Sequence, residues 1–246
     1  MDHLILDIYS ESTTEKKFVR SSSYKRRRNR IERLIQKDPK IDHFLMLAQL
    51  EIRKQQHTEA LEVLESALQI DPHYEPILVL YAQLLAWNED EKAEQVYQKL
   101  LTLQTNRSEI YREYARYLIE REGTVNQIQQ LLFKSLELKP QDAVSHILLA
   151  ELFLREGRSS QALLHLGLAK QYRIHHSVYF VKIAHIYRML GVHDEVRNHL
   201  RMAIQKDPKN KKIRNIAMQI LGEEEQFKRH SIWKLWKNEK SDKMLK

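Results

Sequence analysis

The stretch QKDPK occurs at residues 36–40 and again at 205–209, and the related stretch QIDPH stands at 69–73. Proline ends a helix, because it has no amide hydrogen to donate and its ring disfavours the helical conformation in the residue before it. Each Asp-Pro pair therefore predicts the end of one helix and the start of another segment. The recurrence of one such phrase predicts a structural unit that is itself repeated.

Other residue types recur with the same spacing. Alanines that follow an apolar residue are separated by 33 to 35 residues along the chain. Pro72 and Pro140 lie 68 residues apart, twice a period of 34, and Gly123 and Gly157 lie 34 apart. A period shared by several residue types indicates a repeat architecture. The alanines of this row are Ala48, Ala82, Ala115, Ala150, Ala184 and Ala217.

The residues between these markers have the composition and spacing of helices. The 246 residues include only five Gly and five Pro, and good helix formers such as Leu, Glu, Gln, Lys and Ala are abundant. In residues 41–74, Leu47 and Ala48 mark a first helix, Leu64 and Ala67 mark a second, and the polar stretch KQQHT separates them. The sequence therefore predicts an almost entirely helical chain built from helix–turn–helix units.

This pattern resembles the tetratricopeptide repeat, a 34-residue helix–turn–helix with small residues at positions 8, 20 and 27 and proline at position 32. The unit 41–74 matches these positions with Ala48, Ala60, Ala67 and Pro72. The resemblance implies an all-α fold, an α-solenoid of about five stacked repeats that ends in a C-terminal capping helix.

The resemblance divides the chain into a solenoid, expected at residues 31–222, and an extension at each end. The expected repeats are residues 41–74, 75–107, 108–142, 143–176 and 177–210. We expect a partial helix at 31–40 to cap the front of the solenoid and a helix at 211–222 to cap its end, because terminal repeats need a cover. Residues 1–30 are expected to be a flexible, basic segment, and residues 223–246 a basic tail that contains tryptophan.

Charge and composition argue against several classes of function. The net charge of +8 lies at the ends of the chain, because residues 41–210 hold 20 Lys and Arg against 22 Asp and Glu. This balance argues against a body that wraps nucleic acid. The absence of cysteine excludes disulfides and thiolate metal sites, and no phosphate-binding loop or zinc-protease motif occurs. We therefore expect no enzyme activity, no metal and no cofactor.

The sequence also predicts a cytoplasmic location. The first residues, MDHLILDIYSE, are interrupted by Asp7 and do not form the apolar core of a signal peptide. No other stretch of the sequence has enough consecutive apolar residues to span a bilayer.

The resemblance also implies where a ligand would bind. In tetratricopeptide repeats, ligand contacts tend to come from the first helix of each unit, which lines a concave groove. An arginine-rich groove favours an extended acidic or amide-rich peptide, and Trp87 is a candidate aromatic anchor. The alternative is that these side chains form a solvated inner wall. The corresponding residues are Gln49, Arg53, Gln83, Trp87, Arg112, Arg116, Glu151, Arg155, His185 and Arg188.

The two ends of the chain carry further candidate contacts. The stretch SSSYKRRRNR at 21–30 holds five basic residues, which attract anionic lipid, RNA or an acidic partner by charge alone, or form a solvated lead into the first helix. Near the other end, Ile232, Trp233 and Trp236 fall on one helical face surrounded by lysines. Such a face docks on the last repeat, on another subunit in a homo-oligomer, or at a membrane interface.

Together these observations predict a non-catalytic scaffold or adaptor that binds a protein or peptide partner, acidic in character, and mediates the assembly of a complex. Two alternatives stay open. The stretch IYREYARYLIE at 110–120 resembles the aromatic first helix of half-a-TPR repeats, which occur in RNA-processing complexes. The tryptophan and lysine tail favours a membrane-peripheral assembly factor.

Overall fold

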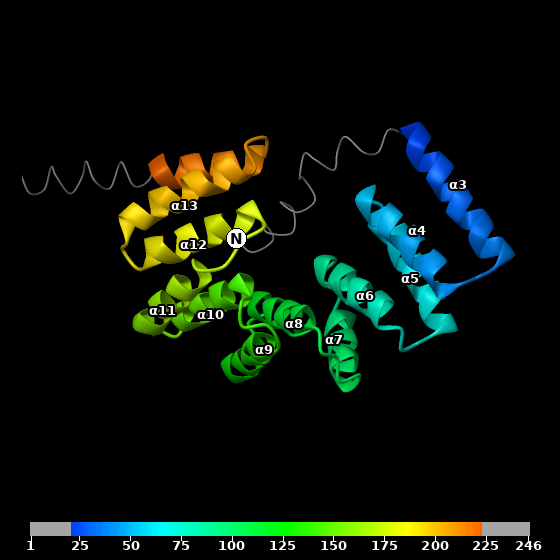
Figure 1. The fold of residues 1–246 in the computed structure, drawn as a ribbon, viewed down its shortest axis with the longest axis horizontal. Coiled ribbons are helices and arrows are strands. Elements are labelled where there is room, and N and C mark those ends of the chain that lie inside the picture. The colour runs from blue at the N-terminus through cyan, green and yellow to red at the C-terminus, as the bar shows by residue number, and fades with distance from the viewer. Residues whose placement is uncertain (1–20, 223–246) are drawn as a thin grey trace, which may run out of the picture. The chain divides into compact units, whose positions relative to one another are not determined.

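The computed structural model describes residues 21–222, which contain helices and turns and no strand (Figure 1). The predicted all-α fold of helix–turn–helix repeats is confirmed for this part of the chain. The chain divides into two compact units, the first ending at Arg173 and the second beginning at Ile174. Each unit is described by itself.

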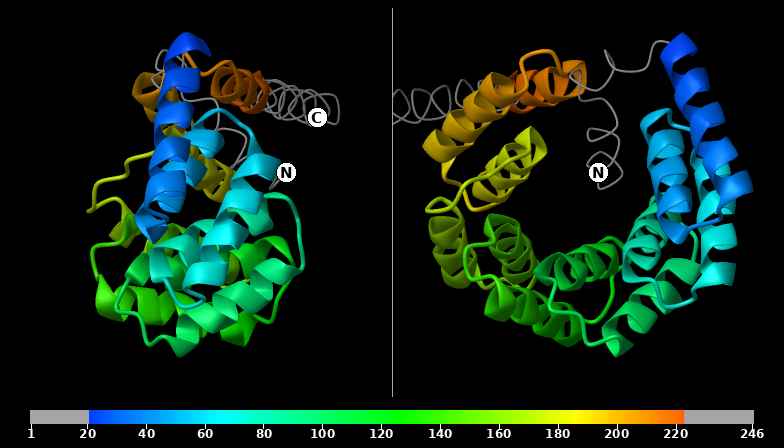
Figure 2. Two further views of the ribbon diagram at one scale, coloured as in Figure 1. Left: turned by 90° about the vertical axis from the view of Figure 1, so that its right-hand side faces the viewer. Right: turned by 45° about the vertical axis from the view of Figure 1, so that its right-hand side comes forward.

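The first unit contains helix α3 (Ser21–Lys37) followed by four antiparallel helical hairpins. Within each hairpin the two helices pack against each other, and the second helix also contacts the first helix of the next hairpin. Helix α8 contacts both α6 and α10, so the first helices follow one another along the inner side of this unit (Figure 2). The hairpins are α4 (Ile41–Arg53) with α5 (His57–Ile70), α6 (Glu75–Trp87) with α7 (Lys92–Thr102), α8 (Ser108–Glu120) with α9 (Val125–Leu138), and α10 (Ala143–Arg155) with α11 (Ser159–Ala169).

The second unit contains the hairpin of α12 (Ser177–Met189) and α13 (His193–Lys206) and then a helix at residues 211–222. Asn210 is 1% exposed, and its side-chain oxygen accepts a hydrogen bond of 3.2 Å from the amide of Ile213. Asn210 therefore caps the start of the last helix, where backbone amides have no partner within the helix. Ile213 and Ala217 are fully buried on the covered face of that helix.

The turn inside every hairpin has the same backbone geometry. The second residue after the end of each first helix has a positive φ, between 55° and 74°. The amide of the next residue then donates a hydrogen bond of 2.8 to 3.0 Å to a carbonyl of the helix, as in a Schellman cap. This geometry recurs whether the residue is glycine or not, so the turn belongs to the repeat rather than to one residue type. The residues are Gln55, Glu89, Glu122, Gly157 and Gly191.

The row of alanines marks the places where helices lie closest together. All six alanines of the row identified in the sequence are fully buried, from Ala48 to Ala217. A second set of small residues, which includes Ala67 and Ser135, is also fully buried on the second helices. Because interiors are packed as densely as organic crystals, a larger side chain has no room at such a position.

The expectation that residues 1–30 form a flexible segment is wrong for residues 21–30, because α3 begins at Ser21. The physical reason is an apolar stripe that continues through the basic stretch. Tyr24 and Ile31 are buried in one hydrophobic cluster with Leu47 and Leu50 of α4. Burial of this stripe stabilises a helix whose opposite face is charged.

A buried polar contact also holds the start of α3. The hydroxyl of Tyr24 donates a hydrogen bond of 2.5 Å to the carboxylate of Glu51, a residue of α4 that is 1% exposed. Burial and the neighbouring Glu51 raise the pKa of Tyr24 to about 12, so the hydroxyl keeps its proton at neutral pH. The Nε atom of Arg28 lies 3.5 Å from the same carboxylate. Glu51 therefore fixes α3 by two side chains one helical turn apart.

No helix between residues 21 and 222 is both long enough and apolar enough to cross a membrane. Ile232, Trp233 and Trp236, the candidate tail contacts, lie outside the described residues.

The packing of the alanine row predicts the effect of enlarging it. We expect Ala150→Leu to lower the free energy of unfolding by about 1–3 kcal/mol, because the added atoms overpack a fully buried position. Urea denaturation followed by circular dichroism measures this change. Gln69→Leu, at an exposed position of α5, is the control and should leave the unfolding midpoint nearly unchanged. Equal midpoints for the two variants would contradict close helix contact at Ala150.

Candidate binding site

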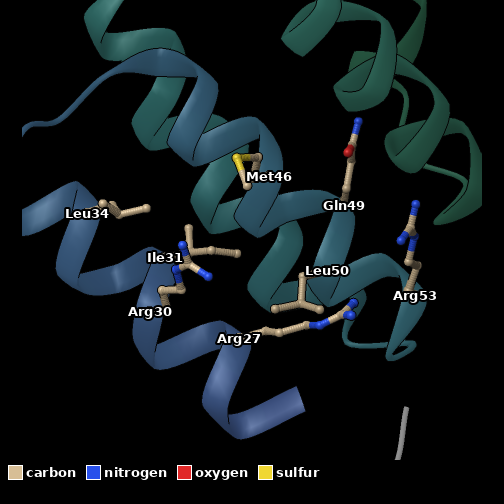
Figure 3. Close-up of a pocket in the computed structure, with 8 residues that line it drawn as sticks. All are labelled: Arg27, Arg30, Ile31, Leu34, Met46, Gln49, Leu50 and Arg53. Carbon is tan, nitrogen blue, oxygen red and sulfur yellow. The ribbon is translucent and has the colours of Figure 1, made fainter. Parts of the chain in front are cut away.

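A cleft of about 400 Å³ lies between α3 and α4 (Figure 3). Each helix contributes lining residues that are three, four and seven positions apart in the sequence. Residues with this spacing share one face of a helix, so the two lining faces can be read from the sequence. Helix α3 supplies Arg27, Arg30, Ile31 and Leu34, and helix α4 supplies Met46, Gln49, Leu50 and Arg53.

The cleft combines apolar and cationic side chains. Ile31 and Leu50 belong to the buried cluster between the helices, whereas Leu34 and Met46 are 37% and 50% exposed and present apolar surface to solvent. Arginines come from both sides, Arg30 from α3 and Arg53 from α4, and no acidic side chain is among the lining residues (Figure 3). This arrangement favours a ligand that carries carboxylates beside apolar side chains.

The net charge of α3 adds to the positive field at the cleft. Its 17 residues include seven Lys and Arg and one acidic residue, Glu32. Arg28 is engaged within the protein, with its Nε 2.9 Å from Glu32, and it does not line the cleft. The excess of basic over acidic residues on α3 gives a surplus of positive charge near the cleft, which attracts anionic ligands over a distance of about one Debye length.

Two of the predicted groove residues, Gln49 and Arg53, lie in this cleft. Both are exposed on the same side of α4, one helical turn apart. The predicted residues of the next hairpin are less accessible. Gln83 and Trp87 are half-buried on α6, and the ring of Trp87 packs edge-on against His57 of α5, with ring centroids 5.4 Å apart. Part of the Trp87 ring, the predicted aromatic anchor, therefore packs within the protein and is not accessible to a ligand.

Arg116, predicted as a groove residue, is buried. Arg116 is 6% exposed, and its Nη2 lies 2.7 Å from Glu113 of the same helix. Arg112 is half-buried as well, with Nη1 3.1 Å from both carboxylate oxygens of Asp142 in the segment before α10. Burial raises the pKa of Glu113, but the charges of Arg116 and Arg112 outweigh it and lower that pKa. Arg112 thus joins α8 to the segment before the next hairpin, and both arginines balance the charge of nearby carboxylates.

Arg155 and Glu151, also predicted for the groove, pair with each other on α10. The Nη2 of Arg155 lies 3.0 Å from Glu151, and its Nη1 donates a hydrogen bond of 3.0 Å to the carbonyl of Ile119 in the preceding hairpin. The expected arginine-rich wall in the middle of the groove thus has its positive charge balanced by carboxylates of the same wall. Charge alone does not make this region a site for acidic ligands.

The last two predicted groove residues, His185 and Arg188, are half-buried on α12 in the second unit. The structure therefore groups the predicted residues into three sets: Gln49 and Arg53 at the cleft, Gln83 to Arg155 along the first unit, and this pair in the second unit. The first set, Gln49 and Arg53, lines the α3–α4 cleft.

Sequence reasoning missed the contribution of α3 to the site. Arg27, Arg30, Ile31 and Leu34 were assigned to a flexible lead or to a short cap, but they form half of the cleft. A signal was present, because Tyr24, Ile31 and Ile35 recur at helical spacing within the basic stretch.

Packing between neighbouring hairpins explains the aromatic residues of α8. Tyr114 stacks on Tyr97 of α7 with ring centroids 5.1 Å apart, and Tyr117 lies 5.6 Å from the same ring. All three tyrosines are buried. The aromatic character that resembles half-a-TPR repeats thus fills the interior between α7 and α8.

A pair of histidines joins α10 to α11. The Nδ1 atoms of His146 and His165 lie 3.0 Å apart, so one ring donates a hydrogen bond to the other. Burial lowers the pKa of both, and together with the charge of His146 it lowers that of His165 to about 4. Residues 21–222 contain no group of three or more His, Asp or Glu placed to hold a metal ion.

Comparison with known proteins identifies the repeat. Residues 51–117 match the model of the tetratricopeptide repeat family. These residues therefore have the sequence of tetratricopeptide repeats, and the helical hairpins have the fold of solved tetratricopeptide repeat proteins. The folds of this family are scaffolds for protein interactions. None of the curated proteins matches the sequence significantly.

Solved tetratricopeptide repeat structures share the fold at low identity. A thermophilic protein of Thermus thermophilus is 17% identical with a TM-score of 0.65, covering 74% of this chain and 99% of its own. PilW, a type IV pilus biogenesis factor, is 15% identical with a TM-score of 0.63, covering 83% of this chain and 96% of its own. A chain of the APC/C hetero-tetramer Cut9-Hcn1 is 15% identical with a TM-score of 0.67 over 80% of this chain, which spans only 40% of that chain.

The buried ion pairs of α8 predict the effect of removing Arg116. We expect Arg116→Met to lower the free energy of unfolding by about 3 kcal/mol, because Glu113 would lose a buried counter-charge. Arg107→Met is the control, since Arg107 is exposed and its pairs with Glu75 and Glu109 contribute at most about 1 kcal/mol. Urea denaturation compares the two, and equal losses would refute a structural role for Arg116.

The histidine pair predicts a pH dependence of stability. Between the ordinary histidine pKa of 6.5 and the lowered value of about 4, the unfolded chain binds more protons than the folded one. Stability should therefore fall as the pH drops from about 6.5 towards 4. In His165→Gln this loss should be smaller than in the wild type, whereas the exposed His73→Gln should behave as the wild type. Thermal midpoints at several pH values measure the difference, and parallel curves for all three proteins would contradict it.

Proposed function

We propose that this chain is a non-catalytic adaptor that binds a partner protein or extended peptide at the α3–α4 cleft and holds it in a complex. The carrying observation is the composition of the cleft, in which arginines from two helices flank apolar side chains and no acidic residue intervenes. A partner segment with acidic and apolar residues matches both features. This proposal keeps the acidic partner and the cytoplasmic location expected from the sequence.

The known proteins with this fold support an interaction role. One similar fold belongs to a chain of the APC/C hetero-tetramer Cut9-Hcn1, so it is part of a multi-protein complex. PilW is described as a pilus biogenesis factor. At about 15% identity these likenesses show the fold alone. The choice of partner then depends on surface residues of this chain such as Arg30 and Arg53, because stacking geometry is common to the family.

The arrangement of polar groups supports a role without catalysis. The carboxylates of Glu113 and Asp142 are bound by arginines, which leaves no free acid beside a base at this place. The histidine pair is neutral and packed between α10 and α11 rather than facing the cleft. We infer that the chemistry of the chain is recognition, carried by charge and apolar surface.

Affinity capture with cross-linking tests this function. The full chain is used to capture partners from an extract of its native cells, in parallel with the double variant Arg30→Glu/Arg53→Glu. We expect the variant to lose the main partner, because two positive charges at the cleft become negative and each charge-assisted contact contributes about 1.5–3 kcal/mol. Cross-links of the wild-type chain should map to residues on α3 and α4.

The matched control is Lys92→Glu/Lys139→Glu, which makes the same change in net charge at exposed positions of the first unit away from the cleft. This variant should keep the partner. If the control and the cleft variant lose it equally, net charge rather than the cleft attracts the partner. Capture of the same proteins by wild type and cleft variant would remove the cleft from the function.

A further inference from the structure

The first eleven residues, MDHLILDIYSE, have the composition that the cleft favours. They contain three acidic residues, Asp2, Asp7 and Glu11, and no Lys or Arg, although the whole chain has a net charge of +8. Apolar residues lie between the acidic ones. Leu4 and Leu6, for example, lie between Asp2 and Asp7. The other acidic cluster at an end of the chain, EEE at 223–225, has no such apolar neighbours within it.

The cleft has surface that a segment of this kind would cover. Met46 is 50% exposed and Leu34 is 37% exposed, and both line the cleft together with the buried Ile31 and Leu50. Removing this apolar surface from water favours binding. Arginines of both helices stand beside this apolar surface, within reach of carboxylates on the same ligand.

The connection between the segment and the cleft is long enough. Nine residues, 12–20, separate the segment from Ser21 at the start of α3. Such a connection spans up to about 30 Å when extended. Along α3 the rise of 1.5 Å per residue places Arg30 roughly 14 Å from Ser21. The segment can therefore turn back along α3 and reach the cleft with slack in the connection.

We propose that residues 1–11 bind in the α3–α4 cleft of the same chain. The apolar residues Leu4 to Leu6 cover Leu34 and Met46, and the carboxylates of Asp2 and Asp7 pair with Arg30 and Arg53. A tether of this length gives the segment an effective concentration of the order of millimolar at the cleft, so a weak intrinsic affinity is enough for occupancy. A partner with the same chemistry must then displace the segment, which lowers its apparent affinity by the fraction of open clefts.

Disulfide trapping tests the proposal, because the chain contains no cysteine of its own. In the full chain, Ile5→Cys is combined with Met46→Cys in the cleft. The comparison protein combines Ile5→Cys with Leu164→Cys, at a position of α11 that is 60% exposed in the same unit. Under mild oxidation of dilute protein, we expect the intrachain disulfide to form about tenfold faster with position 46 than with position 164, because docking raises the local concentration.

A charge exchange tests the proposed pairing. The double substitution Arg30→Glu/Arg53→Glu is added to the protein that carries cysteines at positions 5 and 46. It should slow formation of the disulfide at least about fivefold, since carboxylates would then face carboxylates. Adding Asp2→Lys/Asp7→Lys to that variant should restore the rate. Lys92→Glu/Lys139→Glu, which changes the net charge equally elsewhere, should leave it unchanged. Circular dichroism of each variant confirms that the helices are retained.

Three results would overturn the inference. Equal trapping rates at positions 46 and 164 would show that the segment does not prefer the cleft. Disulfide-linked dimers in place of the intrachain bond would show that a second copy fills the cleft. If the charge exchange does not change the trapping rate, the proposed ion pairs between the segment and the cleft do not form. No partner protein is present in this experiment, so its failure leaves the adaptor function standing, and a failed capture leaves this inference standing.

Discussion

Close contact between helices at fully buried alanines is the constraint on which the hairpins depend. Ala48 on α4 and Ala60 and Ala67 on α5 have no exposed surface. Small side chains at these places let two backbones approach, and larger apolar residues such as Leu64 then fill the space on either side. Because the first helix still has an apolar edge beyond its own partner, the next hairpin must cover it, and the repeats stack. The residue with positive φ in each turn reverses the chain in the same way in every hairpin.

Stacking also decides which charges stay available to a ligand. A side chain on a first helix gains a partner wherever a neighbouring hairpin offers a carboxylate or a carbonyl. Asp142 does so for Arg112, and the carbonyl of Ile119 does so for Arg155. At the front of the first unit the neighbour of α4 is α3, which brings mainly arginines. The surplus of positive charge at the cleft is thus a consequence of what precedes the first complete hairpin.

The sequence was sufficient to predict the hairpins because their determinants are local and periodic. Alanine spacing and Asp-Pro phrases specify the helices and their turns within one 34-residue window. The groove was harder to predict, because a family position gives the direction of a side chain but not its partner. Arg53 and Arg116 looked alike in the sequence, yet one lines a cleft and the other is buried against Glu113. That difference depends on tertiary contacts that no local pattern records.

The first ten residues of helix α3 were assigned to a flexible segment for a related reason. Seven basic residues in 17 indicate a solvated segment, since like charges on one helix repel and cations near its start oppose the helix dipole. The structure offsets this cost with Glu51, a residue of the next helix whose burial could not be read from the sequence.

Helix α3 itself holds seven basic residues and one acidic residue, so its cations repel one another, and an anionic ligand would relieve that repulsion. Binding of acidic side chains at Arg30 and Arg53 would therefore stabilise the docked helix as well as fill the cleft. By the same linkage, interactions that hold α3 against α4 favour binding of a ligand in the cleft. The hydrogen bond from Tyr24 to Glu51 lies at the opposite end of the helix from Leu34, and it holds both walls of the cleft in register. Recognition at this site is thus coupled to the packing of the first helix.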